Sequence, residues 1–281
     1  MSGPRSDVSD WWTTSIIDMA PGQIRMRGRP IEDLIGAVSF PQMVWLMTRG
    51  ELPNEAQSRL LECALVAAVD HGPQAPSIAA ARMAVTCGLG LNGAMASAVN
   101  MLDDVHGGAG EQAVELYGWI DEAAGADPDL EDAAAAMIDR WQAERTRFAP
   151  GFGHRFHKPE DPRAPRLLGL VDAAASEGVV TGRFAAIGRA VQKVLNDRKG
   201  KPVPMNIDGA TAVIYAELGF AGPLARGLFC LSRSVGVLAH AWEQLQQGER
   251  NKGPTPPAYR WTYDGPNPID APVGRAEDSD A

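Results

Sequence analysis

The sequence is poor in the features that mark several broad classes of protein. Cysteine occurs only three times, as Cys63, Cys87 and Cys230, far apart and within apolar helical patterns. This spacing argues against a disulfide framework or a metal site, and we expect three reduced core residues. No apolar run approaches the ~20 residues of a membrane span. The polar start, 1–10, lacks the apolar core of a secretory signal. These absences predict a cytoplasmic protein without a membrane partner.

Positive charge is also in short supply. The formal net charge of the 281 residues is −9, which argues against a nucleic-acid partner. The cations that are present concentrate in two segments, 145–166 and 198–201. A polyanionic ligand would have to bind at such local clusters. The length allows one large domain or two modest ones with a sizeable core.

Apolar residues recur at every third or fourth position along most of the chain, which predicts helices. Asn54 and Gln57 form a capping-box pair at the start of one of them. No stretch alternates apolar and polar residues over a sustained length, so we predict an all-α fold without strands. From Gly248 the chain is polar and rich in proline, and we expect disorder beyond Pro268. The expected helices are 40–49, 54–69, 77–88, 94–102, 111–124, 129–148, 163–177, 181–196, 209–218 and 221–247.

The segment 151–163, GFGHRFHKPEDPR, is the most distinctive stretch of the chain. Gly151 and Gly153 permit tight turns and close approach to a ligand, and two prolines exclude a continuous helix. One interpretation is a solvated basic loop. The other is a rigid loop that presents an imidazole and several cations to an anionic ligand carrying a carbonyl group.

Three further residues each allow a structural and a functional interpretation, and a fourth requires a charged partner. His71, in DHGP, either caps the preceding helix or binds a ligand. His106, in HGGAGE, is either a turn residue or a polar group beside glycine amides. Asp208, in PMNIDG, is either an N-cap or a partly desolvated base. Arg233, on the apolar face of the last helix, requires an anionic partner.

Taken together, HGGA, GFGHR with DPRA, and MNID resemble the citrate synthase superfamily over about residues 15–250. Members of that superfamily make or break a carbon–carbon bond between an acyl-CoA and a 2-oxo acid. The resemblance implies no metal and no permanently bound cofactor, with a coenzyme A thioester as substrate. It assigns catalysis to His106, His154 and Asp208, and binding of the acid substrate to His71, Arg163 and Arg233. We expect the coenzyme A phosphates to bind the cations Arg155, Lys158, Arg198, Lys199 and Lys201.

The resemblance also implies a mostly helical homodimer in which a small domain closes over the substrate. We expect the small, CoA-binding domain at 109–217, inserted in a large domain made of 1–108 and 218–281. A further arginine that synthases bring from the partner subunit has only a loose counterpart in Arg250.

The length and the segments DHGPQAPS, GFGHRFHKPEDPRA and PMNIDGA are closer to citryl-CoA lyases and the lyase-like end of ATP-citrate lyase. We therefore expect cleavage of citryl-CoA to acetyl-CoA and oxaloacetate. A citrate or 2-methylcitrate synthase, or a lyase for a related hydroxyacyl-CoA, stays open. A non-catalytic helical dimer that binds acyl-CoA, which is not an enzyme, is also an open alternative.

Overall fold

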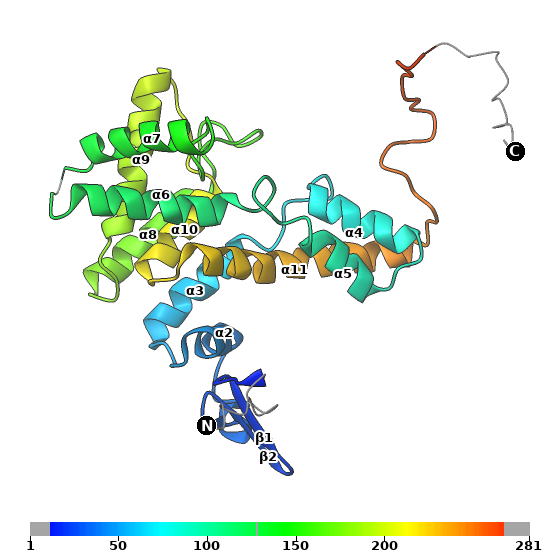
Figure 1. The fold of residues 1–281 in the computed structure, drawn as a ribbon, viewed down its shortest axis with the longest axis horizontal. Helices are drawn as coiled ribbons and strands as arrows, with labels where there is room; N and C mark the ends of the chain where they lie inside the picture. The colour runs from blue at the N-terminus through cyan, green and yellow to red at the C-terminus, as the bar shows by residue number, and fades with distance from the viewer. Residues whose placement is uncertain (1–11, 128, 267–281) are drawn as a thin grey trace, which may run out of the picture.

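A computed structural model describes residues 12–127 and 129–266 and consists mostly of helices (Figure 1). The predicted disorder beyond Pro268 falls outside the described residues. The strands are β1 (Ile17–Ala20), β2 (Gln23–Met26) and β3 (Arg29–Pro30). The helices are α1 (Ile31–Leu34), α2 (Phe40–Arg49), α3 (Glu55–Ala67), α4 (Pro76–Thr86), α5 (Leu91–Val99), α6 (Ala109–Ala124), α7 (Glu131–Glu144), α8 (Arg163–Ser176), α9 (Arg183–Lys199), α10 (Ile207–Glu217) and α11 (Gly222–Gln247).

The predicted all-α, citrate synthase-like architecture is confirmed, but the three strands that the sequence did not predict form a small antiparallel sheet in the order β1-β2-β3. Ile17 pairs with Met26 and Ala20 with Gln23, and Gly22 adopts a φ of 75° in the intervening turn. The strands are too short for a sustained alternation, and β1 is exposed along its length. Such a sheet lacks the one-sided burial that gives a strand its period-two signal.

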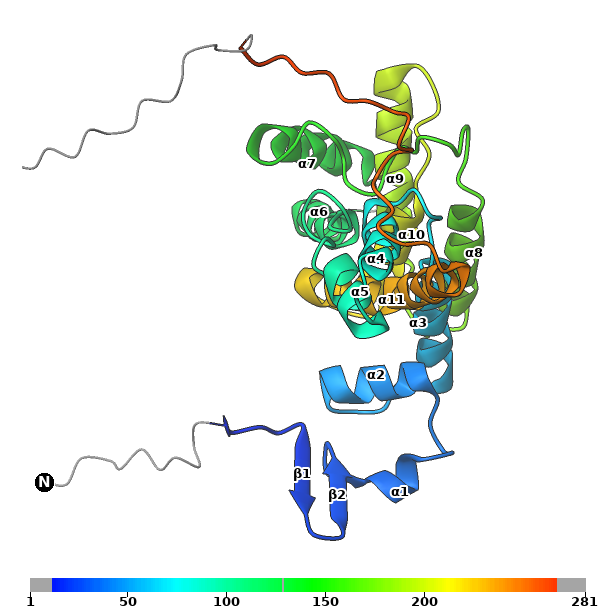
Figure 2. The same ribbon diagram turned by 90° about the vertical axis from the view of Figure 1, so that its right-hand side faces the viewer.

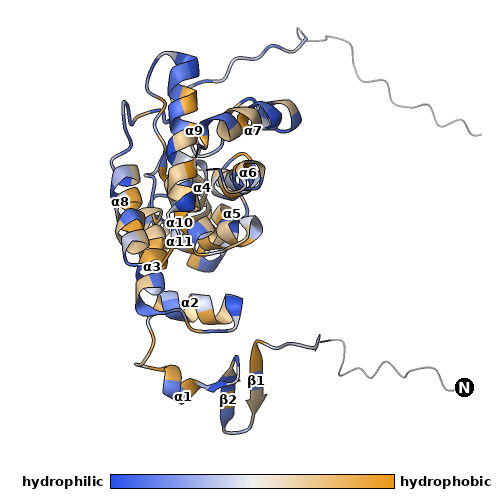
Figure 3. Ribbon diagram, turned by 90° about the vertical axis from the view of Figure 1, so that its left-hand side faces the viewer, coloured by the Kyte–Doolittle hydropathy of each residue, from blue (hydrophilic) through white to orange (hydrophobic). Residues whose placement is uncertain are grey.

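Helix α11 is the long axis of the molecule (Figure 1). Helices α4 and α5 pack beside its C-terminal half, and α6 packs near its N-terminal end. Figure 2 shows α1 and the sheet beyond α2 and α3, at a distance from the other helices. Apolar residues of α1 and β1 lie on this outlying part (Figure 3), where Ile17, Met19 and Ile35 are exposed.

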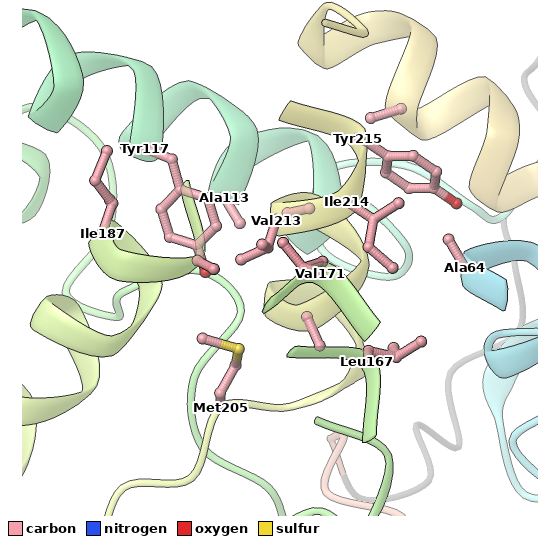
Figure 4. Packing of buried hydrophobic residues seen from close by; sticks show 14 of the residues in the cluster. Ala64, Ala113, Tyr117, Leu167, Val171, Ile187, Met205, Val213, Ile214 and Tyr215 are labelled. Carbon is pink, nitrogen blue, oxygen red and sulfur yellow. The ribbon is translucent and has the colours of Figure 1, made fainter. Parts of the chain in front are cut away.

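Helix α10 forms the centre of the main core. Ile207 and every residue from Gly209 to Tyr215 are buried, and α3, α6, α8 and α9 pack around them. Figure 4 shows Val213 and Ile214 of α10 close to Val171 of α8, with Tyr117 of α6 on the far side of Val213. Because α10 is apolar on all sides, the polar residues of its first turn are held in place by a dense surround.

The predicted capping box at Asn54 and Gln57 is confirmed, with both reciprocal hydrogen bonds formed. The structural interpretation of Asp208 as an N-cap is wrong. Asn206 caps α10 instead, and its side chain accepts from the backbone N–H of Asp208 and Gly209. The carboxylate of Asp208 is therefore not used to begin the helix.

All three cysteines are free thiols, as expected, but not all are core residues. Cys63 and Cys230 are partly buried, whereas Cys87 is exposed. The reason is that Cys87 is the C-cap of α4, where the chain turns out of the packed layer. Among the described residues, no helix is long and apolar enough to span a membrane.

Candidate active site

A pocket of about 330 Å³ opens where the ends of several elements meet the middle of α11. Six of the residues predicted from the sequence line this pocket, although they come from five separate parts of the chain. They are His71, His106, His154, Arg155, Asp208 and Arg233.

The glycine loop brings His154 next to the start of α10. The N–H of Asn206 donates to the carbonyl of Gly151 over 2.9 Å, and the N–H of Gly153 donates to the carbonyl of Pro204 over 2.7 Å. Gly151 has a φ of 82°, and a Cβ there would lie 2.5 Å from the Cα of Gly209. Only glycine permits this backbone contact, which sets the separation of the imidazole and the carboxylate.

His154 is held in one tautomer. Its Nδ1 accepts the backbone N–H groups of Phe156, at 3.1 Å, and of His157, at 3.0 Å. A nitrogen that accepts two N–H bonds carries no proton, so neutral His154 carries its proton on Nε2. Burial, and then the neighbouring His157, lowers the pKa of His154. The ring is therefore a neutral hydrogen-bond donor at neutral pH.

His106 is held in the opposite tautomer. The backbone N–H of Ser77, in the first turn of α4, donates to His106 Nε2 over 3.2 Å, and Ser77 Oγ lies 2.9 Å from the same nitrogen. Neutral His106 thus carries its proton on Nδ1. Burial, and then the charge of Arg233, lowers its pKa. Sequence reasoning missed Ser77, whose signal was only that of a residue that begins a helix.

Asp208 is a half-buried carboxyl at the mouth of the apolar core. Burial raises its pKa, and the charges of Arg233 and Arg163 offset part of that rise. A carboxylate of raised pKa is a stronger base than an exposed one. This site therefore supplies a base and, in its protonated form, an acid.

Arg233 is buried in the wall of the pocket, with only 3% of its surface exposed. Its Nε donates to the carbonyl of Ala68 over 3.1 Å, and its guanidinium lies 4.8 Å from the ring centroid of Phe229. Burial lowers its pKa, while the charges of Asp208 and Asp70 act against that change. A desolvated guanidinium facing a pocket is suited to binding a carboxylate.

His71 meets His154 edge to face, with ring centroids 5.5 Å apart. It follows α3 rather than capping it, since that helix ends at Ala67. Burial, and then Arg233 and Arg163, lowers its pKa. Neutral His71 therefore adds a third imidazole to the pocket.

Arg163 lies behind the pocket rather than in its lining. Its backbone N–H and guanidinium donate to the fully buried Asp161 over 2.7 to 3.1 Å. Although burial opposes ionisation, these hydrogen bonds hold the pKa of Asp161 below its usual value. In this arrangement Arg163 contributes its charge to the pocket while Asp161 fixes its side chain.

The predicted coenzyme A cations are only partly brought together. Arg155 lines the pocket, and Lys199 lines a second pocket of about 560 Å³ that shares Gly153 with the first. Lys158 and Lys201 are exposed and lie outside both linings. Arg198 donates both terminal nitrogens to the carboxylate of Asp139. Sequence reasoning did not assign Phe148 and Phe152, which give the second pocket its aromatic walls.

His154, His157 and Asp161 form the one group of metal-ligating type within the described residues. Each has a ligand atom within 4.8 Å of the others. However, Asp161 is already bound to the Arg163 guanidinium, whose charge opposes a cation at this position. We therefore assign no metal to this group.

This helical architecture, with imidazoles, a carboxylate and an arginine around one pocket, is a citrate synthase-like fold. The profile of the family described as "Citrate synthase, C-terminal domain" matches residues 54–255, and the chain belongs to the citrate synthase family.

Similarity to individual proteins points to two branches of this family. The chain is 30% identical over 218 residues to citrate synthase of Haloferax volcanii, which covers 77% of this chain and 53% of that protein. It thus spans about half the length of the curated relatives it matches. Citryl-CoA lyase from Hydrogenobacter thermophilus superposes with a TM-score of 0.79 at 31% identity, covering 93% of this chain and 97% of that one. ATP citrate lyase from Methanothrix soehngenii shares the fold, with a TM-score of 0.76 at 19% identity over 94% of this chain and 43% of that one.

Proposed function

We propose that this protein is a carbon–carbon lyase that cleaves citryl-CoA to acetyl-CoA and oxaloacetate. The observation that carries the proposal is the meeting of His106, His154 and Asp208 at one pocket with Arg233 in its wall. Similarity to a citryl-CoA lyase along almost the whole of both chains supports the lyase branch.

The chemistry is simplest to follow in the direction of condensation. Asp208 removes a methyl proton from acetyl-CoA, and the Nδ1–H of His106 donates a hydrogen bond to the thioester oxygen, which gains negative charge. The enolate carbon attacks the keto carbon of oxaloacetate, whose oxygen accepts a hydrogen bond from the Nε2–H of His154 and takes its proton from water. A thioester α-proton is weakly acidic, so the base and the oxyanion partner must act together.

Cleavage is the reverse of these steps. The hydroxyl oxygen of citryl-CoA loses its proton to water and accepts a hydrogen bond from the Nε2–H of His154, as the bond between the hydroxyl-bearing carbon and the thioester methylene breaks. The electron pair of that bond forms the enolate of acetyl-CoA, which protonated Asp208 converts to a methyl group. Arg233 and His71 hold and orient the acid, while Arg163 adds positive charge from outside the lining, and the reaction involves no oxidation or reduction.

The second pocket is suited to the nucleotide end of coenzyme A. Phe148 and Phe152 offer aromatic surface for a base, while Arg147 and Lys199 offer positive charge for phosphate. Arg155, Lys158 and Lys201 are exposed and are the further candidates to bind phosphate. Arg198, by contrast, would have to leave Asp139 to take part.

We also propose that the protein acts as a homodimer in which 109–217 closes over the substrate. Helix α11 exposes a stripe of apolar side chains at helical spacing, which a second copy would cover. The stripe consists of Leu231, Val235, Leu238, Trp242 and Leu245. In such a dimer Arg250, just beyond α11, is the candidate for an arginine shared between subunits.

The decisive experiment supplies citryl-CoA and detects oxaloacetate through malate dehydrogenase and the loss of NADH. In parallel, acetyl-CoA and oxaloacetate are supplied and free CoA thiol is measured. Rapid oxaloacetate formation with little free thiol is the expected result. Free CoA as the main product would instead identify a citrate synthase, because that enzyme hydrolyses the thioester.

Three other outcomes remain distinguishable. A 2-methylcitrate synthase would release thiol from propionyl-CoA faster than from acetyl-CoA. A lyase for a related hydroxyacyl-CoA would cleave that ester and leave citryl-CoA untouched. A non-catalytic acyl-CoA-binding dimer would bind the thioesters without turnover, and Asp208→Asn would leave its binding function intact.

A further inference from the structure

Arg226, near the start of α11, contacts three carboxylates at once. Its guanidinium donates to Asp103 and Asp104, which precede the His106 loop, and to Glu111, which follows it. The side chains of Arg226 and Glu111 are 21% and 22% exposed, so this ion pair is largely shielded from water. One guanidinium thus forms ion pairs with residues at both ends of the segment that carries His106.

The segment between these carboxylates is tightly folded. The N–H of Asp103 donates to the carbonyl of His106 over 2.8 Å, and the side chain of Gln112 donates to the carbonyl of Asp104 over 3.0 Å. A Cβ on Gly108 would lie 2.8 Å from the Cα of Asp104. Because the loop is this compact, movement of either end changes the position of the imidazole.

Arginine suits this position because its planar fork carries five N–H donors, enough for three carboxylates. Without that charge, the three carboxylates would repel one another across the loop. Asp103 and Asp104 lie before the predicted domain boundary at 109, and Glu111 lies after it. Arg226 therefore also joins the two predicted domains where the chain passes between them.

We infer that Arg226 is a positioning residue, which fixes the His106 loop so that Nδ1 faces the thioester oxygen. The inference rests on the proposed function for its catalytic consequence but not for its structural one. Asp103 and Asp104 are 78% and 76% exposed, so their ion pairs add little to global stability. The effect of losing Arg226 should therefore fall on the loop and on turnover.

The first test needs no substrate. Hydrogen–deuterium exchange of the intact protein, followed by mass spectrometry, is compared for wild type, Arg226→Gln and Arg189→Gln. Arg189 makes a similar double contact with Asp172 on an exposed surface remote from His106 and serves as the control. Faster exchange of 102–112 in Arg226→Gln alone is expected. Unchanged exchange of that segment would overturn the inference, whatever the protein's substrate.

The second test asks whether Arg226 acts through His106. Enolisation is measured as exchange of the acetyl-CoA methyl hydrogens with deuterated water in the presence of oxaloacetate. Arg226→Gln should slow it about 10- to 100-fold, as loss of an outer contact to a working group often does. The KM for oxaloacetate should change much less. The exchange rate of Arg226→Lys should lie between the rates of wild type and Arg226→Gln.

A double-mutant cycle completes this test. In a His106→Gln background, Arg226→Gln should cause little additional loss, because the group that it positions is already absent. Full additivity of the two losses would overturn the inference, even if loop exchange had increased. Absence of turnover in the wild type would count against the proposed function alone, since the exchange experiment still decides whether Arg226 holds the loop.

Discussion

At the scale of single residues, the pocket combines two neutral imidazole donors with one carboxyl whose ionisation is suppressed. Backbone N–H groups fix the tautomers of His106 and His154, so each ring presents one N–H and keeps its opposite nitrogen engaged. Burial lowers the pKa of both imidazoles and raises the pKa of Asp208, which makes this carboxylate a stronger base than an exposed one. Burial and backbone hydrogen bonds thus determine which side chains act as hydrogen-bond donors and which acts as the base.

Asp208→Asn tests the role of the carboxylate. We expect turnover to fall by about 10³- to 10⁴-fold, the upper range for loss of a general acid–base group. Thermal stability should be equal to or higher than that of wild type, because the raised pKa means that the ionised form is disfavoured in the folded state. Between the ordinary carboxyl pKa of about 4 and the raised value, the folded state binds more protons, so wild-type stability falls as pH rises. Kinetics and thermal unfolding measured across this range check both expectations, and a variant that unfolds earlier than wild type would contradict them.

Arg233 tests the electrostatic coupling to Asp208. Enolisation of acetyl-CoA requires ionised Asp208, so its rate should fall on the acidic side with a midpoint above the ordinary carboxyl value of about 4. Because the charge of Arg233 lowers the pKa of Asp208, Arg233→Gln should move that midpoint to higher pH. Arg233→Lys keeps the charge and is the matched control: it should weaken acid binding and leave the midpoint near its wild-type position. A midpoint that shifts equally in both variants would show that charge is not the cause.

At the scale of elements, the pocket depends on how loops are joined to helix ends. The glycine loop is hydrogen-bonded to 204–206, and this contact places His154 opposite the first turn of α10. The chain at Ala68 and Val69 is likewise joined to α11, through Arg233 and the N–H of Gly236. Each of these contacts requires two backbone segments to approach closely. At Gly151 and Gly236 there is no room for a side chain.

Gly151→Ala tests the joint between the loop and α10. The substitution places a methyl group against Gly209 in a backbone conformation of positive φ. We expect a loss of roughly 1–2 kcal/mol from the left-handed conformation and a further 1–3 kcal/mol from overpacking, with loss of turnover. Gly178→Ala is the control, since its φ is 72° but its Cβ would meet nothing within 4 Å. Equal losses of unfolding free energy in chemical denaturation would refute the close-contact argument.

At the scale of the whole molecule, the exposed stripe on α11 is the surface that we propose a second copy covers. Trp242 and Leu238 are 49% and 41% exposed, which is unusual for adjacent turns of a long helix that packs on its other side. The proposed closure of 109–217 would act across the pocket that this helix borders. In this proposal, dimerisation and closure would both depend on α11.

Trp242→Asp tests the proposed dimer. A buried charge on the shared stripe should weaken association strongly, so light scattering should give the monomer mass for the variant and the dimer mass for wild type. Val66→Asp changes an exposed apolar residue on α3, 64% exposed, and should leave the mass unchanged. A wild-type monomer, or a dimer that survives Trp242→Asp, would reject this surface as the interface.

The sequence alone located most of the helices and indicated which side chains are candidates for the reacting groups. Helical periodicity and capping are local properties, so α2, α3 and α11 could be located closely, and glycine-rich segments pointed to His106 and His154. Strands of four residues with exposed faces carry too weak a pattern, and β1 to β3 were missed for that reason.

Only the tertiary structure decided how these groups are used. Ser77 fixes His106 from 29 positions away, and Asn206 takes the capping role that Asp208 might have filled by sequence. Arg198 is bound to Asp139, and Arg226 collects three carboxylates from across a loop. Histidine tautomers, pKa shifts and ion pairs depend on burial and on partners distant in the chain. The periodicity of a sequence contains no information about burial by distant segments or about such partners.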